Sequence, residues 1–155
     1  MNVEPLRLPK LPNRALQPIL FVETAAAFDD LTRSDRDDLM VRQSDDAWPN
    51  LFRTARMVPA VEYVQAMRLR TRLMRDLDAA FDGFDAVITP GRWNSLVALT
   101  NYTGHPTLTL RASVTNGKPR SVTLIGPLYE EGKLIRLGMA LERRLEVRDL
   151  RPPID

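Results

Sequence analysis

The sequence has 155 residues, of which 44% are hydrophobic and 27% charged, and its formal net charge is +2. This length and composition fit one globular domain and exclude a disordered, collagen-like or low-complexity protein. The sequence contains no Cys, which excludes disulfides, a thiol nucleophile and Cys-ligated metal sites. No uncharged stretch is both long and apolar enough to span a bilayer, and residues 1–10 have no signal-peptide core, so we expect a cytoplasmic protein without a membrane partner.

The first 18 residues are predicted to form an extended, proline-rich lead-in. Pro5, Pro9 and Pro12 each remove a backbone donor and disfavour helix in the residue before them. We favour a segment that lies over a neighbouring surface, and a ligand for a proline-recognising domain is the alternative. The predicted domain then occupies residues 19–146, and residues 147–155 form a tail.

Helical periodicity predicts three helices in the first half of the chain. They cover residues 19–31, a short stretch that begins at Trp48 with Pro49 in its first turn, and residues 59–82. Each helix is predicted to bury one stripe of apolar side chains. The stripes are Leu20, Ala25, Phe28 and Leu31 in the first helix, Phe52 and Ala55 in the second, and Ala60, Val64, Met67, Met74, Leu77 and Phe81 in the third.

The second half of the chain is predicted to supply a sheet and a closing helix. Residues 86–89 indicate a short strand buried on both faces. Residues 107–114 alternate, with Leu108, Leu110, Ala112 and Val114 on one face, and the pair Asn116 and Gly117 predicts a hairpin turn to a strand over residues 121–125. A helix follows over residues 130–146. The predicted fold class is α/β, with helices packed on a small mixed sheet that contains an antiparallel hairpin.

An acidic cluster follows the first predicted helix and has two interpretations. Its residues are Asp29, Asp30, Asp35, Asp37 and Asp38. Such a cluster can bind a metal ion, but no ligand loop with a turn glycine accompanies it. Since Arg33 and Arg36 alternate with these carboxylates, we favour helix caps and solvated ion pairs.

A basic face on the long predicted helix also has two interpretations. It comprises Arg68, Arg70, Arg72 and Arg75. Such a face can follow phosphates, but acidic residues interrupt it and no aromatic side chains offer stacking surfaces. We therefore predict a helix packed into a larger body and no nucleic-acid partner.

Side chains suited to catalysis or metal binding are few. None of the five Ser, at positions 34, 44, 95, 113 and 121, lies in a Gly-rich turn that would expose its oxygen. The single His105 lies between Gly104 and Pro106, and we interpret it as a hydrogen-bonded structural residue rather than a catalytic base. One His and no Cys disfavour zinc, and the scattered glycines form no phosphate-binding loop. We therefore predict no catalytic residue, no metal ligand and no cofactor.

Several runs of residues, taken in order, carry a family resemblance. They are ILFVETAAAF (19–28), WPNLFR (48–53), VPAVEYVQAMR (58–68), DAVITP (85–90), TNYTGHP (100–106), VTLIG (122–126) and EEGKL (130–134). Together they resemble the C-terminal third of amidase signature enzymes, over about residues 15–146. The runs NYTGHP and WPN are the most specific parts, and the ordered set is more specific than any one run.

The resemblance implies an incomplete piece of a serine hydrolase fold that cleaves carboxamides. It also implies that the catalytic residues, two Ser and a Lys, lie in a Gly/Ser-rich stretch upstream of the matched region. This sequence has no Ser-Ser pair, and its Lys10, Lys118 and Lys133 do not match the position of the family's Lys. We therefore expect a C-terminal fragment that supplies scaffold and part of the substrate pocket and is inactive alone, so whether the chain itself is an enzyme stays open.

Two segments depart from the family pattern. Residues 111–114 replace a Pro and a Gly-Phe-like step, so the resemblance does not predict the strand register there, and the link over residues 90–101 is short. Ligands of α/β sheets bind beyond the carboxyl ends of strands. The residues predicted to face a substrate pocket are therefore Gly91, Arg92, Trp93 and Asn94, and a loop that only covers the sheet edge is the alternative.

An incomplete sheet also predicts a partner. We expect an exposed apolar strand edge where the rest of the sheet would pair. Its occupant is either an upstream amidase fragment or a second copy of the chain. The alternative function is a non-catalytic interaction or dimerisation module that has kept the scaffold.

Overall fold

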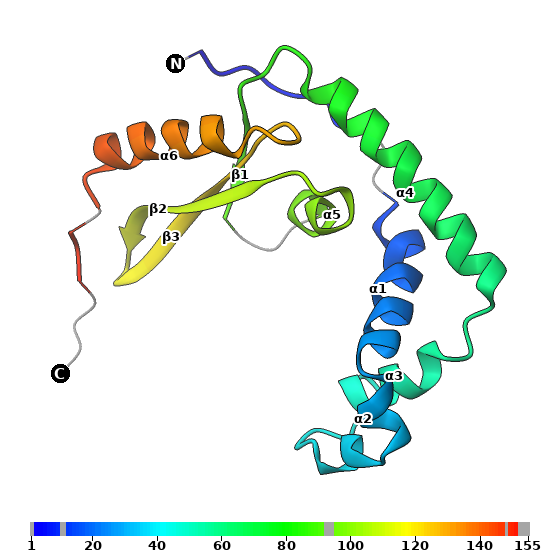
Figure 1. The fold of residues 1–155 in the computed structure, drawn as a ribbon. Helices are drawn as coiled ribbons and strands as arrows, with labels where there is room; N and C mark the ends of the chain where they lie inside the picture. Colours follow the sequence, from blue (N-terminus) through cyan, green and yellow to red (C-terminus); the bar gives the residue numbers. More distant parts are fainter. Residues whose placement is uncertain (1, 10–11, 92–94, 148, 152–155) are drawn as a thin grey trace. The chain divides into compact units, whose positions relative to one another are not determined.

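The computed structural model describes residues 2–9, 12–91, 95–147 and 149–151 (Figure 1). Residues 12–72 form one compact unit, and residues 1–11 with 73–155 form another. We call them the helical unit and the sheet unit and describe each by itself. None of the helices within the described ranges is long and apolar enough to cross a membrane.

The helical unit is built from α1 (Asn13–Ala27), α2 (Asp29–Arg33), the 3₁₀ helix η1 (Arg36–Leu39), α3 (Trp48–Ala55) and the first half of α4 (Ala60–Phe81). Helices α1 and α3 pack against each other. Leu16, Ile19 and Phe52 are at most 4% exposed and form the centre of this packing. The ring of Phe52 stacks on Phe28 at 5.1 Å and on Trp48 at 5.8 Å between centroids, which ties the end of α1 to α3.

Helix α1 differs from its prediction at both ends. It begins at Asn13 rather than at residue 19 and includes Pro18. The missing donor of Pro18 is tolerated because buried Leu16 and Ile19 on either side anchor the helix in the core. The predicted stripe is wrong for Leu20, which is 43% exposed, and for Phe28, which lies beyond the helix end.

Helix α4 matches its predicted length, and its buried stripe is partly as predicted. Leu77 and Phe81 are at most 2% exposed, as expected, and Leu73 joins them one turn earlier. Val64, predicted to be buried, is 47% exposed, whereas Ala66 is buried. The true stripe therefore lies on a slightly rotated face of the helix.

The sheet unit contains β1 (Val87–Pro90), α5 (Ser95–Thr103), β2 (Thr107–Thr115), β3 (Lys118–Ile125) and α6 (Glu131–Leu145). The strand order is β1-β3-β2, and both ladders are antiparallel, whereas the sequence predicts a mixed sheet. Since β1 and β2 are each antiparallel to the central β3, they run in the same direction without pairing, and α5 connects them. The α/β class and the hairpin are confirmed.

The hairpin turn and the helix that covers the sheet follow from individual residues. Asn116 and Gly117 have φ values of 52° and 70°, the left-handed pair that a two-residue hairpin turn requires. Helix α6 packs on β2 (Figure 1), and a Cβ at Gly138 would lie 2.2 Å from Cδ2 of Leu108. The missing side chain at Gly138 therefore permits this close approach.

A β-bulge explains where the predicted face of β2 fails. The pairing with β3 shifts register between Arg111 and Ser113. Before the bulge Leu108 and Leu110 are half-buried as expected, whereas beyond it Ser113, Val114 and Thr115 are all exposed, with Val114 at 43%. The shift falls within residues 111–114, where the sequence departs from the family pattern.

In the segment from residue 86 to 103, one expectation is wrong and one helix was not predicted. Strand β1 is not buried on both faces, because its exposure alternates and Ile88 is 45% exposed. The short link after β1 contains a helix, α5, which was not predicted. Leu96, Leu99, Thr100 and Thr103 are its buried residues, and their spacing is that of one helix face.

Candidate functional site

Gly91, one of four residues predicted to face a pocket, lies directly after β1. Its N–H donates a hydrogen bond to the Ser121 carbonyl at 2.8 Å, and the Ser121 hydroxyl donates to the Gly91 carbonyl at 3.1 Å. A Cβ at Gly91 would lie 2.1 Å from Oγ of Ser121, so a side chain does not fit here. Gly91 therefore continues the β1–β3 ladder. Arg92, Trp93 and Asn94 lie outside the described residues, and their role in a pocket stays a prediction.

His105 is buried, at 4% exposure, in the sheet unit. Its Nδ1 lies 2.9 Å from Oγ1 of Thr103, and its ring meets Phe81 edge-on at 5.1 Å between centroids. Because the Thr103 hydroxyl already donates to the Leu99 carbonyl at 3.3 Å, we assign the tautomer in which Nδ1–H donates a hydrogen bond to Oγ1 of Thr103. Nε2 is then a lone-pair acceptor, and within the described residues it has no hydrogen-bond partner.

Burial keeps this imidazole neutral. Desolvation lowers the pKa of His105, and the charge of Asp78 opposes this effect without reversing it. A neutral ring held by Thr103 and packed on Phe81 has the geometry of a structural residue, as the sequence indicated. A general base needs access to a substrate proton, which a side chain 4% exposed does not have.

Three Ser hydroxyls have structural partners. Those of Ser34 and Ser121 donate to backbone carbonyls, the first to Asp30 at 2.7 Å. The hydroxyl of Ser44 donates to the Asp46 carboxylate at 2.7 Å. Lys133, one of three lysines in the sequence, lies 3.2 Å from the Asp85 carboxylate, so its ammonium is used in an ion pair.

The acidic cluster of the helical unit is arranged as ion pairs. Asp29 pairs with Arg33 at 2.5 Å and also with Arg56, and hydrogen bonding from Arg33 is the first of the causes that lower the pKa of Asp29. Asp37, at 1% exposure, lies 2.7 Å from the guanidinium of Arg53. Within the described residues, no three His, Asp or Glu side chains are grouped so that they could hold a metal ion.

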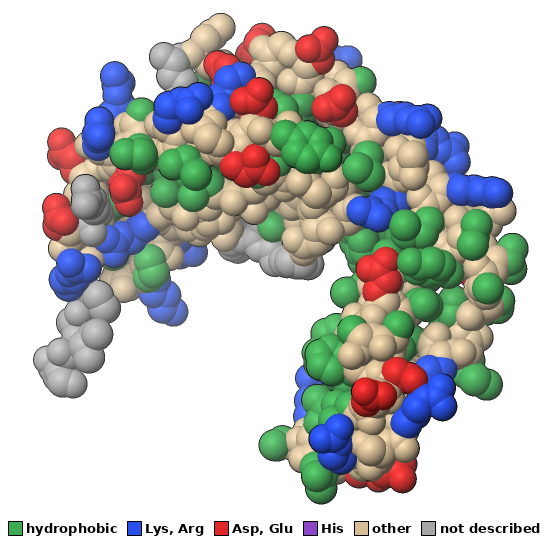
Figure 2. Space-filling view, in the orientation of Figure 1, with side chains coloured by type: hydrophobic (Ala, Val, Ile, Leu, Met, Phe, Trp, Pro, Cys, Tyr) green, Lys and Arg blue, Asp and Glu red, His purple; other side chains and the backbone are tan. Residues whose placement is uncertain are grey.

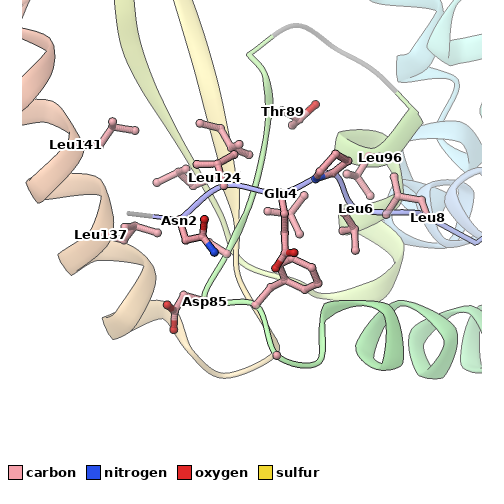
Figure 3. A pocket seen from close by; sticks show the side chains of 17 residues that line it. Asn2, Glu4, Leu6, Leu8, Asp85, Thr89, Leu96, Leu124, Leu137 and Leu141 are labelled. Carbon is pink, nitrogen blue, oxygen red and sulfur yellow. The ribbon is translucent and has the colours of Figure 1, made fainter.

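The sheet unit contains a partly open pocket of about 860 Å³ (Figure 3). One wall is the N-terminal segment, which has neither helix nor strand over residues 2–9. The opposite wall combines residues 83–89 with leucines from α5, β3 and α6. The described lining residues are Asn2, Val3, Glu4, Pro5, Leu6, Leu8, Gly83, Phe84, Asp85, Ala86, Val87, Ile88, Thr89, Leu96, Leu124, Leu137 and Leu141.

Sequence reasoning did not find this pocket. Gly91 does not line it. The N-terminal segment was expected to lie over a neighbouring surface, but nothing in its composition identified that surface. The sequence feature that could have pointed to the pocket is the leucine stripe of α6. It predicts an apolar helix face but does not identify the segments that face it.

The helical unit leaves several large apolar side chains exposed. Hydrophobic side chains are visible along this unit in Figure 2. The exposed ones include Phe28, Leu39, Val41, Trp48 and Met57, with exposures from 45% to 105%. Single exposed apolar residues are ordinary on protein surfaces, so these define no site by themselves.

An α/β fold of this kind is found in solved amidases. A structure described as an amidase covers 90% of this chain with a TM-score of 0.76 at 21% identity, and this chain covers 37% of it. A bacterial aryl acylamidase of the amidase signature family gives a TM-score of 0.63 at 18% identity, with 88% and 35% covered. At these identities the likeness concerns the fold.

Comparison of sequences shows which proteins this chain resembles. The glutamyl-tRNA(Gln) amidotransferase A subunit from Desulforamulus reducens is 27% identical over 111 residues, which are 59% of this chain and 23% of that protein. The chain thus spans about a quarter of the length of that curated relative. No protein-family model matches the chain. Its homologues and structural neighbours are amidase signature proteins, and its own fold is a partial amidase signature fold.

Proposed function

We propose that this chain functions as the C-terminal part of an amidase-type serine hydrolase, which breaks the C–N bond of carboxamides. In this proposal it supplies scaffold and part of the substrate pocket. The catalytic Ser, Ser and Lys come from upstream residues outside this sequence, so the chain is inactive alone. The observation that carries the proposal is the match to 23% of the amidotransferase relative and 37% of the amidase structure.

The side chains of the described residues support the lack of activity. Acyl transfer needs a nucleophile, a base and hydrogen-bond donors around one point. The base candidate His105 is buried on Thr103 and Phe81. The Ser121 hydroxyl donates to the Gly91 carbonyl, and Lys133 lies beside the exposed Asp85, so these two groups are not paired with each other.

The sheet supports a need for a partner. In the described sheet β1 and β2 are the outer strands, and outer strands are where further strands can add. Addition there would place the remainder of an amidase sheet beside the strands seen here. The exposed Ile88 of β1 is one apolar side chain that such a partner would cover.

The first test measures activity in the purified chain. We expect no hydrolysis of aryl carboxamides and no labelling by a serine-directed fluorophosphonate. Turnover together with labelling of one of the chain's own Ser residues would refute the proposal.

The second test supplies the upstream part. The N-terminal portion of an amidase signature enzyme, cut where its match to this chain begins, is co-expressed with the chain. We expect a complex, and labelling only on the added fragment. A chain carrying Ile88→Asp, which places a charge on the exposed side chain of β1, should bind less of the fragment. Equal capture by both chains would argue against docking at the sheet.

A second candidate function is a dimerisation module without chemistry. The observation in its favour is again the pair of outer strands, because a second copy can pair with either of them. Analytical ultracentrifugation of the chain alone distinguishes the two. A monodisperse dimer that unfolds cooperatively and captures no amidase fragment would favour the module over the hydrolase part.

A further inference from the structure

We propose that the pocket of the sheet unit binds an amphiphilic amine, a small molecule with an apolar body and one ammonium group. The proposal concerns the cavity described above and does not depend on the proposed hydrolase function. It rests on the pocket's volume, on the leucines of its mixed polar and apolar lining, and on the sign of the charges that line it.

The volume and the walls define the size and character of the ligand. A pocket of about 860 Å³ lies within the range of small-molecule sites. In Figure 3, Leu137 and Leu141 project from α6 at one end, and Leu6, Leu8 and Leu96 lie at the other. Leu96 and Leu124 are at most 6% exposed and add little surface, whereas the half-buried Leu6, Leu137 and Leu141 offer more to a ligand. Such walls favour an aromatic or long alkyl body.

The charges that line the pocket determine which polar group a ligand should carry. Among the described lining residues, the two charged side chains are Glu4 and Asp85, and both are carboxylates. Glu4 makes no ion pair with the described residues, and its side chain comes from the N-terminal wall (Figure 3). A ligand ammonium next to Glu4 gains a charge-assisted hydrogen bond, whereas a ligand carboxylate is repelled.

Lys133 does not change this selection. Its ammonium lies 3.2 Å from Asp85, but Asp85 is 81% and Lys133 41% exposed. An exposed pair of this kind is weak and exchanges readily with water or with another cation. Lys133 is not among the lining residues, so the lining charge without an ion pair to the described residues is that of Glu4, which is exposed on the N-terminal wall.

The test compares two probes that share a fluorophore and differ in charge. Dansylcadaverine carries an ammonium, and dansyl-ε-aminocaproic acid carries a carboxylate. Each is titrated into the whole chain at low salt while the dansyl emission, which rises in apolar surroundings, is recorded. We expect saturable binding of the amine at one site per chain and about five- to tenfold weaker binding of the acid.

Two variants assign the binding to this pocket. Glu4→Gln removes a surface charge without a folding risk and should weaken amine binding roughly threefold while leaving the acid unchanged or tighter. Glu131→Gln, an exposed carboxylate in the first turn of α6 that does not line the pocket, is the matched control and should change neither. A chain lacking residues 2–9 should bind neither probe tightly, since one wall is lost.

Three results would overturn the proposal. They are equal affinity for the two probes, the same amine preference in Glu4→Gln as in the parent chain, and no saturable binding of either probe. The last result would mean that the cavity is only space left by packing.

Discussion

Gly91 and Ser121 lie so close together that a side chain at position 91 would clash with Ser121. A Cβ at Gly91 would lie 2.6 Å from the backbone carbonyl carbon of Ser121 as well as 2.1 Å from its hydroxyl oxygen. Backbone atoms of a sheet do not move aside as the end of a side chain does. The β1–β3 ladder therefore depends on glycine at this position.

Gly91→Ala is expected to lower the free energy of unfolding by about 1–3 kcal/mol, the usual cost of overpacking. Urea denaturation followed by circular dichroism measures it. Gly132→Ala is the matched control, since a Cβ there meets only the end of Arg136 at 3.6 Å and helix α6 gains propensity. If the two variants are equally stable, the close approach has no energetic weight.

The buried imidazole predicts a pH dependence of stability. Burial lowers the pKa of His105 in the folded chain below its unfolded value of about 6.5. As pH falls through about 6.5, the unfolded chain takes up a proton that the folded chain does not, so stability decreases until the folded pKa is also passed. The free energy of unfolding should therefore be higher near pH 8 than near pH 5.5. Urea denaturation at the two pH values measures it.

His105→Asn isolates this contribution. The amide can replace Nδ1 as the donor to Thr103 and does not titrate. We expect a smaller change in stability between the two pH values in the variant than in the parent chain. An unchanged pH dependence would assign the effect to other groups.

The aromatic stack of the helical unit should dominate its stability. Phe52→Ala removes a ring that is 4% exposed and stacks on both Phe28 and Trp48. The expected loss is about 3–5 kcal/mol. Leu39→Ala, at a residue 82% exposed, should change stability by less than about 0.5 kcal/mol. Thermal unfolding compares the two, and similar midpoints would mean that the stack is not part of the core.

The ion pair of Asp37 and Arg53 predicts a non-additive effect. Arg53→Met leaves the buried Asp37 carboxylate without its guanidinium and should cost about 2 kcal/mol. Asp37→Asn together with Arg53→Met removes the uncompensated charge and should cost less than the single Arg53 change. A double-mutant cycle from urea denaturation measures this, and additive losses would show that the two side chains do not couple.

The sequence predicted those parts of the fold whose signal is local. The Asn116–Gly117 turn, the long helix α4 and the closing helix α6 each depend on residues within a few positions of one another. Helix α5 was missed because two of its four buried residues, Thr100 and Thr103, are polar and were not counted in an apolar stripe. The start of α1 was missed because Pro18 indicated a boundary that packing overrides.

The candidate site was harder to predict than the fold. Its walls come from residues 2–8, from residues 83–89 and from leucines of α5, β3 and α6, and no local pattern connects these segments. The structural character of His105 was predictable from its Gly-His-Pro setting, but its partner Phe81 was not. The bulge between Arg111 and Ser113 likewise depends on pairing with β3, which periodicity does not report.

The central place of β3 sets the order in which the sheet unit can form. Val87 pairs with Ile125, and Thr107 pairs with the same residue from the other side. Neither β1 nor β2 has its ladder in this sheet until β3 has been synthesised. During translation the first two strands therefore stay without their ladders in this sheet until β3 has left the ribosome.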